Sequence, residues 1–242
     1  MTQKNRAGVF DTVGSLGIPR SGFCRSEYQF HDIILGPAVE YAFHALAIDE
    51  QREPFQPAVW KSNPNPRVSQ TVEQVWFPGV HSNIGGGYPE HVLSDSTLFW
   101  MASRVAPLLE LDRQYLAAQA QAERVRPYAT GKLVDSMTAF YRLFTGRHVR
   151  PICETDASEG VHQSAFLRLD NTKGAPDPSP YGNAELKRRL EEKRDRMVPL
   201  SDYEKELLAA IPKTEPEKIM DRAHRRTTFC DWIITLLGGY RP

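Results

Sequence analysis

Two side chains, an aspartate and a histidine, have the types and positions best suited to chemistry. Asp11 directly follows the apolar segment 6–10, and His81 comes four residues after the apolar segment 71–77. A carboxylate that binds an imidazole fixes its tautomer and stabilises the imidazolium, so that the ring can take a proton from a hydroxyl nucleophile. The two residues therefore indicate the acidic and basic members of a serine-type relay.

Three consecutive glycines, Gly85, Gly86 and Gly87, follow His81 at a distance of four residues. Glycine adopts backbone conformations that other residues avoid, and loops of this kind often carry function. We expect these glycines to let the loop of His81 fold tightly beside a site. The alternative is a nest of N–H groups for a phosphate, but no Lys and no Ser/Thr follows at the spacing of a P-loop.

The elements around the two candidates predict how they meet. Segments 6–10 and 71–77 are predicted strands, because they are short, apolar and bounded by turn residues. Between them, an amphipathic helix is predicted from an i, i+3, i+4, i+7, i+8 pattern, made by Val39, Ala42, Phe43, Leu46 and Ala47. A right-handed crossover makes the two strands parallel, which brings Asp11 and His81 to the same carboxyl edge of a sheet.

The remaining chain is predicted to be mostly helical. Helices are expected at 94–105, where Pro107 ends the helix, and at 112–125, 131–144 and 184–197. Residues 170–183 are rich in Pro and Gly and form a linker or long loop, and the apolar segment 229–242 packs on the body. We expect a catalytic part at residues 1–146 and a mostly helical extension at 147–242.

Composition excludes several classes of protein. The 242 residues carry 30 basic and 30 acidic side chains, which gives no electrostatic case for a nucleic-acid partner. Cys24, Cys153 and Cys230 are too few and too widely spaced for a disulfide framework or a zinc site, and we expect neither a metal nor a cofactor. No signal peptide and no run of about 20 apolar residues is found, so a cytoplasmic protein is expected. The oligomeric state is left open.

The nucleophile that the relay requires is missing from the sequence. In α/β hydrolases the chain order is Ser, Asp, His, and the serine lies in a G-x-S-x-G elbow between a strand and a helix. No such elbow occurs here, and the nearest segment, Val13–Gly17, has Val13 in place of the first glycine and follows Asp11. Neither Ser15 nor Ser82 has an elbow around it.

Three long segments carry a resemblance to a known family. They are "GVFDTVGSLGIP" (8–19), "FHDIILGPAVEYAFHALAIDEQREPFQPAVW" (30–60) and "VWFPGVHSNIGGGY" (75–88). Together they resemble a microbial family of α/β hydrolases that includes type VI secretion phospholipase effectors and many fungal members. The resemblance covers residues 7–116, with weaker similarity at 133–146 and 161–169. It implies ester hydrolysis, phospholipid substrates, and Asp11 and His81 as the aspartate and histidine of the triad.

The family's nucleophile lies in a "GFSRG"-like elbow well upstream, and no position of this sequence matches it. We therefore expect a partial α/β-hydrolase fold, with two or three parallel strands and predominantly helical surroundings. The expected function is that of the C-terminal half of a lipase- or phospholipase-like enzyme that is inactive alone. Two alternatives stay open: a non-catalytic module or pseudoenzyme that uses an exposed sheet edge, and two chains that together rebuild the hydrolase. Interfacial contact with a membrane is a minor hypothesis.

Other polar residues are expected to be structural. His31, His44 and His162 have no partner that the sequence identifies and are assigned to the core or the surface. Asp49, Glu50 and Arg52 are expected to form a salt-bridge cluster at the end of the predicted helix, without a chemical role; these three residues lie within the segment "IDEQRE".

Overall fold

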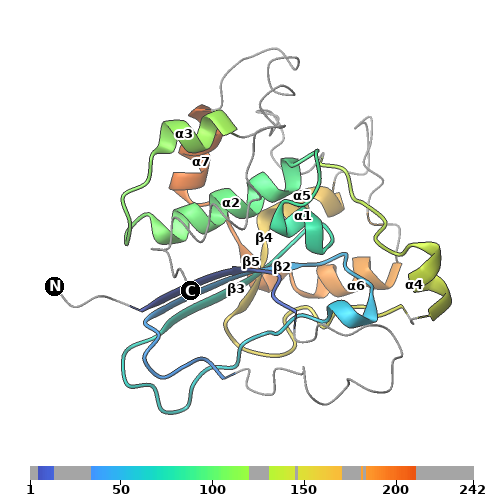
Figure 1. Ribbon diagram of the computed structural model, residues 1–242, viewed down its shortest axis with the longest axis horizontal. Helices are drawn as coiled ribbons and strands as arrows, with labels where there is room; N and C mark the ends of the chain where they lie inside the picture. The colour runs from blue at the N-terminus through green and yellow to red at the C-terminus, as the bar shows by residue number, and fades with distance from the viewer. Residues whose placement is uncertain are drawn as a thin grey trace.

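The computed structural model describes residues 5–13, 34–119, 131–144, 147–170, 181 and 184–210 (Figure 1). The described residues form an α/β structure around one parallel sheet with the strand order β1-β2-β3-β4-β5. The prediction of two or three strands was therefore wrong, because the sheet has five: β1 Arg6–Phe10, β2 Tyr41–Ala47, β3 Thr71–Phe77, β4 Glu159–His162 and β5 Met197–Val198.

The helix predicted near residues 37–50 was also wrong, because Tyr41–Ala47 is the strand β2. This strand pairs with β1 on one side and β3 on the other, and Ala42–Ala47 is entirely buried. A parallel strand that is covered on both faces has a continuous apolar sequence rather than an alternating one. Such a sequence also satisfies a helical pattern, so periodicity alone does not separate the two structures.

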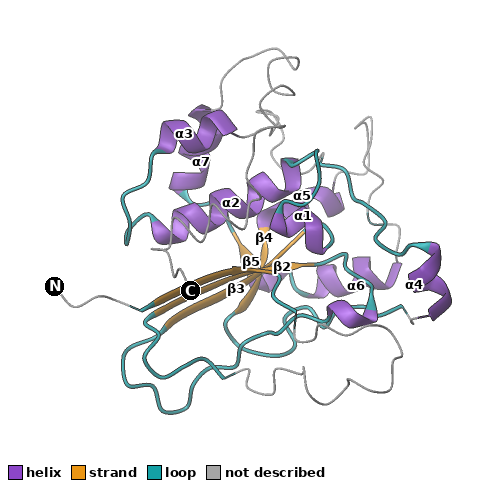
Figure 2. Cartoon of the chain, viewed as in Figure 1, coloured by secondary structure: helices purple, strands orange, loops and turns teal. Residues whose placement is uncertain are grey.

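The side chains of β2 and β3 alternate between the two faces of the sheet. Phe43, Ala45, Val75 and Phe77 pack on one face against the helices α1 (His81–Gly85) and α2 (Val92–Val105). The ring of Trp100 from α2 lies edge-on to Phe77 at 5.5 Å between centroids. Figure 2 shows α2 running along this side of the sheet.

The opposite face carries the second large apolar cluster. Leu46 and Trp76 point to this face and pack with residues of α5 (Gln163–Asp170) and α6 (Ala184–Glu192). In Figure 1, α6 lies on the side of the sheet away from α2. Strands β4 and β5, which flank these helices in the chain, were not predicted. They have only four and two residues, too few for a readable pattern.

The other described elements surround this core. Helices α3 (Arg113–Gln119) and α7 (Asp202–Ala210) pack on α2 through an apolar cluster that includes Phe99, Leu116 and Leu207. The short elements are α4 (Ala139–Phe144) and the 3-10 turns η1 (Glu53–Phe55) and η2 (Arg194–Arg196). None of the helices in the described ranges has the length and apolar content needed to cross a membrane.

Several predicted elements agree with the structure. Segments 6–10 and 71–77 are strands with the predicted bounds, and α2 ends at Val105, two residues before Pro107. The predicted helix at 131–144 is only six residues long, and the one at 184–197 ends at Glu192. The apolar segment 229–242 lies outside the described residues, as does His31.

Candidate active site

Asp11 lies at the carboxyl end of β1 with an unusual backbone conformation. Its φ of 45° is in the left-handed region, which Asp tolerates better than most residues. The backbone N–H donates to the Ala45 carbonyl at 2.7 Å, so this conformation continues the pairing with β2. The fully buried carboxylate accepts a hydrogen bond through Oδ1 from the N–H of Ala47 at 2.8 Å. The strand ends thus fix the side chain as well as the backbone.

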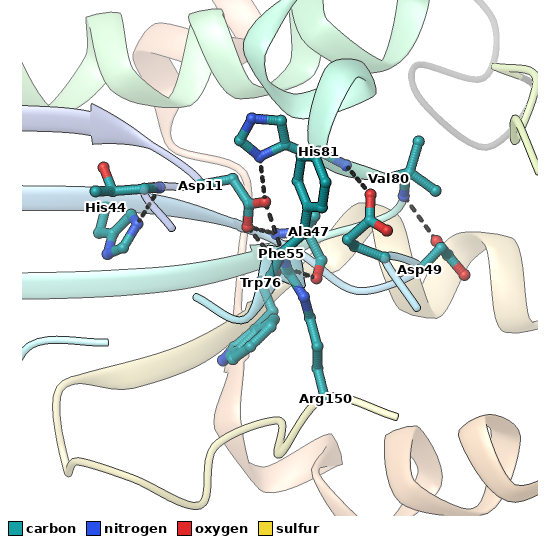
Figure 3. A network of polar contacts seen from close by, with 12 residues as sticks. Asp11, His44, Ala47, Asp49, Phe55, Trp76, Val80, His81 and Arg150 are labelled. Carbon is teal, nitrogen blue, oxygen red and sulfur yellow. Dashed lines mark hydrogen bonds and ion pairs between the residues drawn. The ribbon is translucent and has the colours of Figure 1, made fainter. Parts of the chain in front are cut away.

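His81 is the first residue of α1, directly beyond the turn that follows β3. Its Nδ1 lies 2.8 Å from Asp11 Oδ2, so the structure brings together the two residues that the sequence singled out (Figure 3). Because the carboxylate accepts, Nδ1 carries the proton and Nε2 keeps its lone pair. The side chain is 31% exposed, and no hydrogen bond joins Nε2 to any residue in the described part of the chain. Within the described residues, this basic nitrogen is therefore left to accept a proton from an incoming group.

The turn before His81 depends on Gly79. Its φ of 126° is unfavourable for any residue with a side chain, and a Cβ there would lie 2.6 Å from the Cβ of Asn83. The Gly79 N–H donates to Asp49 Oδ2 at 2.7 Å, and the Asp49 N–H donates to the Gly79 carbonyl at 2.9 Å. This reciprocal pair ties the end of β3 to the end of β2 and sets the position of His81.

The three consecutive glycines, which were expected in a loop, lie at the end of α1. Gly85 is the last residue of the helix, and Gly86 caps it with a left-handed φ of 82°. The N–H groups of Gly86 and Gly87 both donate to the carbonyl of Ser82, at 3.1 and 2.8 Å. The expected loop is thus a single helical turn that these residues close.

Arg150 is a site residue that sequence reasoning missed. Its guanidinium, 1% exposed, donates from Nη1 to Asp11 Oδ1 at 2.5 Å and from Nη2 to Asp11 Oδ2 at 3.0 Å. Burial alone would raise the pKa of Asp11, but the charge and hydrogen bonds of Arg150 together with those of His81 hold the pKa well below its ordinary value. Asp11 is therefore ionised at neutral pH. The sequence contains no local signal for this contact, which spans 139 positions.

His44 supports the backbone on the other side of Asp11. It is fully buried, and burial lowers its pKa to about 4, so the ring is neutral at physiological pH. Its Nε2 accepts a hydrogen bond from the Thr12 N–H at 3.2 Å, and its ring lies 4.9 Å from that of Trp60. This histidine, assigned by sequence to the core or the surface, fixes the residue that follows Asp11.

A second set of residues contacts His81. The Phe55 ring lies edge-on to the imidazole with 5.3 Å between centroids, and the Arg52 guanidinium lies 3.6 Å above the Phe55 ring. Arg52 also pairs with Glu50 at 2.7 Å, and Glu50 accepts the His81 N–H at 3.3 Å. The predicted Glu50–Arg52 pair is present, although it follows a strand instead of a helix. Asp49 is separate from that pair.

A second relay of Ser, His and carboxylate occurs elsewhere in the molecule. His162 binds Ser164 Oγ through Nδ1 at 2.8 Å and Glu204 Oε1 through Nε2 at 3.1 Å. All three residues have no exposed surface. A substrate cannot reach this relay, so it is a structural link between β4 and α7. Over the described ranges, no group of three His, Cys, Asp or Glu residues is arranged to hold a metal ion.

The fold and the polar pair define a class of protein. The sheet is parallel with helices on its faces, and Asp11 and His81 lie at the carboxyl ends of its strands, where such sheets bind their ligands. Residues 3–104 match the family described as "T6SS, Phospholipase effector Tle1-like, catalytic domain". This is the family that the sequence motifs predicted, and its description is that of a phospholipase. No curated protein and no solved structure matched the chain.

Proposed function

We propose that this chain provides the acid–base half of a serine ester hydrolase that acts on phospholipids. The observation that carries the proposal is the 2.8 Å contact between His81 Nδ1 and the buried Asp11 carboxylate, with Nε2 open on the other side of the ring. The phospholipid class comes from the family matched by residues 3–104.

The geometry supports the chemistry of such a relay. A serine hydroxyl placed at His81 Nε2 transfers its proton to the ring while its oxygen attacks the ester carbonyl. Asp11 stabilises the imidazolium that forms, and the imidazolium then protonates the departing alcohol. Water takes the place of the alcohol and repeats the two proton transfers in the second half of the reaction.

We infer that the nucleophile comes from outside these 242 residues, because the sequence has no G-x-S-x-G elbow. The strand that leads into the nucleophile can pair with β1, because β1 lies at an edge of the described sheet. The backbone amide of Asp11 and the carbonyl of Asn5 bond to β2. The alternation of a parallel ladder therefore directs the backbone groups of Arg6 and Gly8 to the other side, where a further strand can pair.

The test combines the chain with a polypeptide that carries the missing strand, elbow and helix. The chain alone should neither hydrolyse phospholipid vesicles nor react with a fluorophosphonate, a probe that labels activated serines. The mixture should hydrolyse the vesicles and lose this activity with His81→Ala. Hydrolysis by the chain alone that persists in His81→Ala would contradict the proposed relay.

Mass spectrometry of the fluorophosphonate-treated chain separates the two parts of the proposal. Labelling of Ser15 or another serine of this chain, abolished by His81→Ala, would retain the hydrolase and refute the external nucleophile. Ser82→Ala is the matched control, because Ser82 is adjacent to His81 in sequence but belongs to α1 and has no elbow.

A non-catalytic module is the second candidate function, and the edge position of β1 favours it. In that case a partner chain would pair with β1 without using the relay. Binding of the complementing polypeptide should then be unchanged by His81→Ala, and no hydrolysis should appear in the mixture. The hydrolase proposal instead requires both binding and activity.

A further inference from the structure

We propose that Arg150 is a positioning residue of this site, which fixes the Asp11 carboxylate against His81 and ties the Phe55 segment to the same point. The proposal rests on the proposed use of Asp11 and His81 as acid and base. Arg150 lies outside residues 3–104, the part of the chain matched by the family.

The guanidinium of Arg150 holds the carboxylate at two points. Its two terminal nitrogens contact both oxygens of Asp11, at 2.5 and 3.0 Å, in the parallel arrangement that a planar fork allows. The same nitrogens also donate to the carbonyls of Ala47 at 2.8 Å and Phe55 at 2.5 Å. A lysine ammonium is a single point of charge and cannot hold the two oxygens in this plane. In Figure 3, Arg150 and His81 approach the carboxylate from opposite sides.

The two oxygens of the Asp11 carboxylate have different partners. Oδ1 accepts from the Ala47 N–H and from Arg150, and Oδ2 accepts from His81 and from Arg150. Rotation of the carboxylate would break these contacts together, so Oδ2 stays directed at the imidazole. Among the described residues, the fully buried carboxylate would keep no ion-pair partner except His81 without Arg150, and a buried carboxylate without a compensating charge takes up a proton.

Arg150 also contacts the segment that carries Phe55. Arg150 holds the carbonyl of this residue, whose ring lies 5.3 Å from that of His81. One buried side chain therefore supports the imidazole in two ways, through the carboxylate at Nδ1 and through the aromatic ring at its edge. A residue that served only the stability of the fold would not need both links to converge on His81.

The test uses the whole chain and the Nδ1 proton of His81, which a nitrogen-edited proton spectrum detects at low field and His81→Gln assigns. In Arg150→Ala the exchange of this proton with water should rise about tenfold or more, the factor expected when a charge-assisted hydrogen bond is lost. Arg150→Lys should retain the charge but restore the wild-type exchange rate only in part. An unchanged rate in the folded Arg150→Ala variant would overturn the proposal.

Two controls separate positioning from general stability. Arg104→Ala removes a partly buried arginine, paired with Glu73 at 2.7 Å, and should leave the His81 proton unchanged. Added methylguanidinium should slow the exchange in Arg150→Ala, whereas methylammonium should not. Equal effects of the two cations, or an Arg104→Ala effect as large as that of Arg150→Ala, would refute a specific fork. If Arg150→Ala does not fold, Arg150→Lys with the same measurement decides.

The kinetics of the mixture with the complementing polypeptide provide a second test, independent of the proton-exchange measurement. There, Arg150→Lys should lower kcat about 100-fold with little change in KM, because the substrate does not touch this residue. Hydrolysis that is unaffected by Arg150→Lys would refute positioning and leave the proposed function intact. A His81 proton that depends on Arg150 in a mixture without hydrolysis would refute the proposed function and retain the positioning role.

Discussion

At the scale of single residues, the site depends on a buried charge that is fully compensated. Asp11 is completely buried, yet each oxygen has two hydrogen-bond partners and a guanidinium supplies the opposite charge. The sequence could identify Asp11 and His81, because each follows an apolar strand and the family motifs include both. It could not identify Arg150, because a contact across 139 positions has no local pattern.

Replacing Asp11 should show how much its pairing with Arg150 contributes to the free energy of unfolding. In Asp11→Asn, the guanidinium of Arg150 stays buried without its counter-charge, which costs about 3–5 kcal/mol of the free energy of unfolding. Urea denaturation measures this loss. The control is Asp135→Asn, whose carboxylate is 59% exposed and pairs with Arg142, and it should cost at most about 1 kcal/mol. Equal losses in the two variants would mean that the Asp11–Arg150 pair adds nothing to stability.

Asp49 and His44 should give opposite pH dependences of stability. Burial raises the pKa of Asp49 to about 7, so this residue contributes stability at low pH that is lost as pH rises from about 4 to about 7. Between pH 5 and 8, Asp49→Asn should gain about 3 kcal/mol relative to wild type, because the amide does not titrate.

Burial lowers the pKa of His44 to about 4, so its contribution to stability is present above about pH 6.5 and is lost as pH falls. His44→Gln should therefore lose about 2 kcal/mol relative to wild type over the same rise from pH 5.

Urea titrations at several pH values measure both effects. The opposite signs make each variant the control for the other. Parallel shifts in Asp49→Asn and His44→Gln would contradict the assignment of these protonation states, as would a wild-type curve that neither substitution changes.

At the scale of elements, short sequence patterns predict the strands β1 and β3, which precede Asp11 and His81. They do not predict β2, the strand between them. β1 and β3 are bounded by turn residues, and the sequence predicts their bounds, whereas the continuous apolar sequence of β2 also fits a helical pattern and predicts a helix. The topology that this strand imposes is simple. Asp11, Asp49 and His81 follow three neighbouring parallel strands, so their proximity depends on the sheet and not on a crossover helix.

The turn between β3 and α1 should be more sensitive to substitution than the end of α1. Gly79→Ala should cost about 1–3 kcal/mol, because the residue needs a positive φ and the new Cβ would meet Asn83 at 2.6 Å. Gly85→Ala is the matched control, since a Cβ there meets no heavy atom within 4 Å and the φ of Gly85 is not positive. It should be neutral or slightly stabilising. Denaturation curves compare the two, and an equal cost would show that the turn does not constrain His81.

At the scale of the molecule, the site is assembled from parts that are distant in the chain. Asp11 and His81 lie within the family match at residues 3–104, but Arg150 and the strands β4 and β5 lie beyond it and complete the same sheet and the same charge network. The predicted division near residue 146 stays a prediction, although both parts contribute strands to one sheet. The matched segment 3–104 does not contain Arg150, whose charge the buried Asp11 carboxylate requires.

The buried His162–Glu204 pair should make α7 and the sheet unfold as one unit. Glu204 accepts from His162, at the end of β4, at 3.1 Å and from the Ser201 hydroxyl, directly before its own helix α7, at 2.7 Å. Glu204→Ala leaves the buried imidazole without its acceptor, and the expected loss is about 3 kcal/mol or more. The loss should appear equally in tryptophan fluorescence, to which Trp76 of the sheet and Trp100 of α2 contribute, and in circular dichroism, which reports on all helices.

The matched control for this pair is Glu206→Ala, on the same helix with a side chain 59% exposed beside Arg113. It should change the free energy of unfolding by at most about 1 kcal/mol, as exposed pairs do. Coincident fluorescence and dichroism transitions in Glu204→Ala would place α7 within the cooperative unit that holds Asp11 and His81. A separate early transition in dichroism alone would show that α7 detaches without disturbing the sheet, and the His162 link would then have no role in holding the site together.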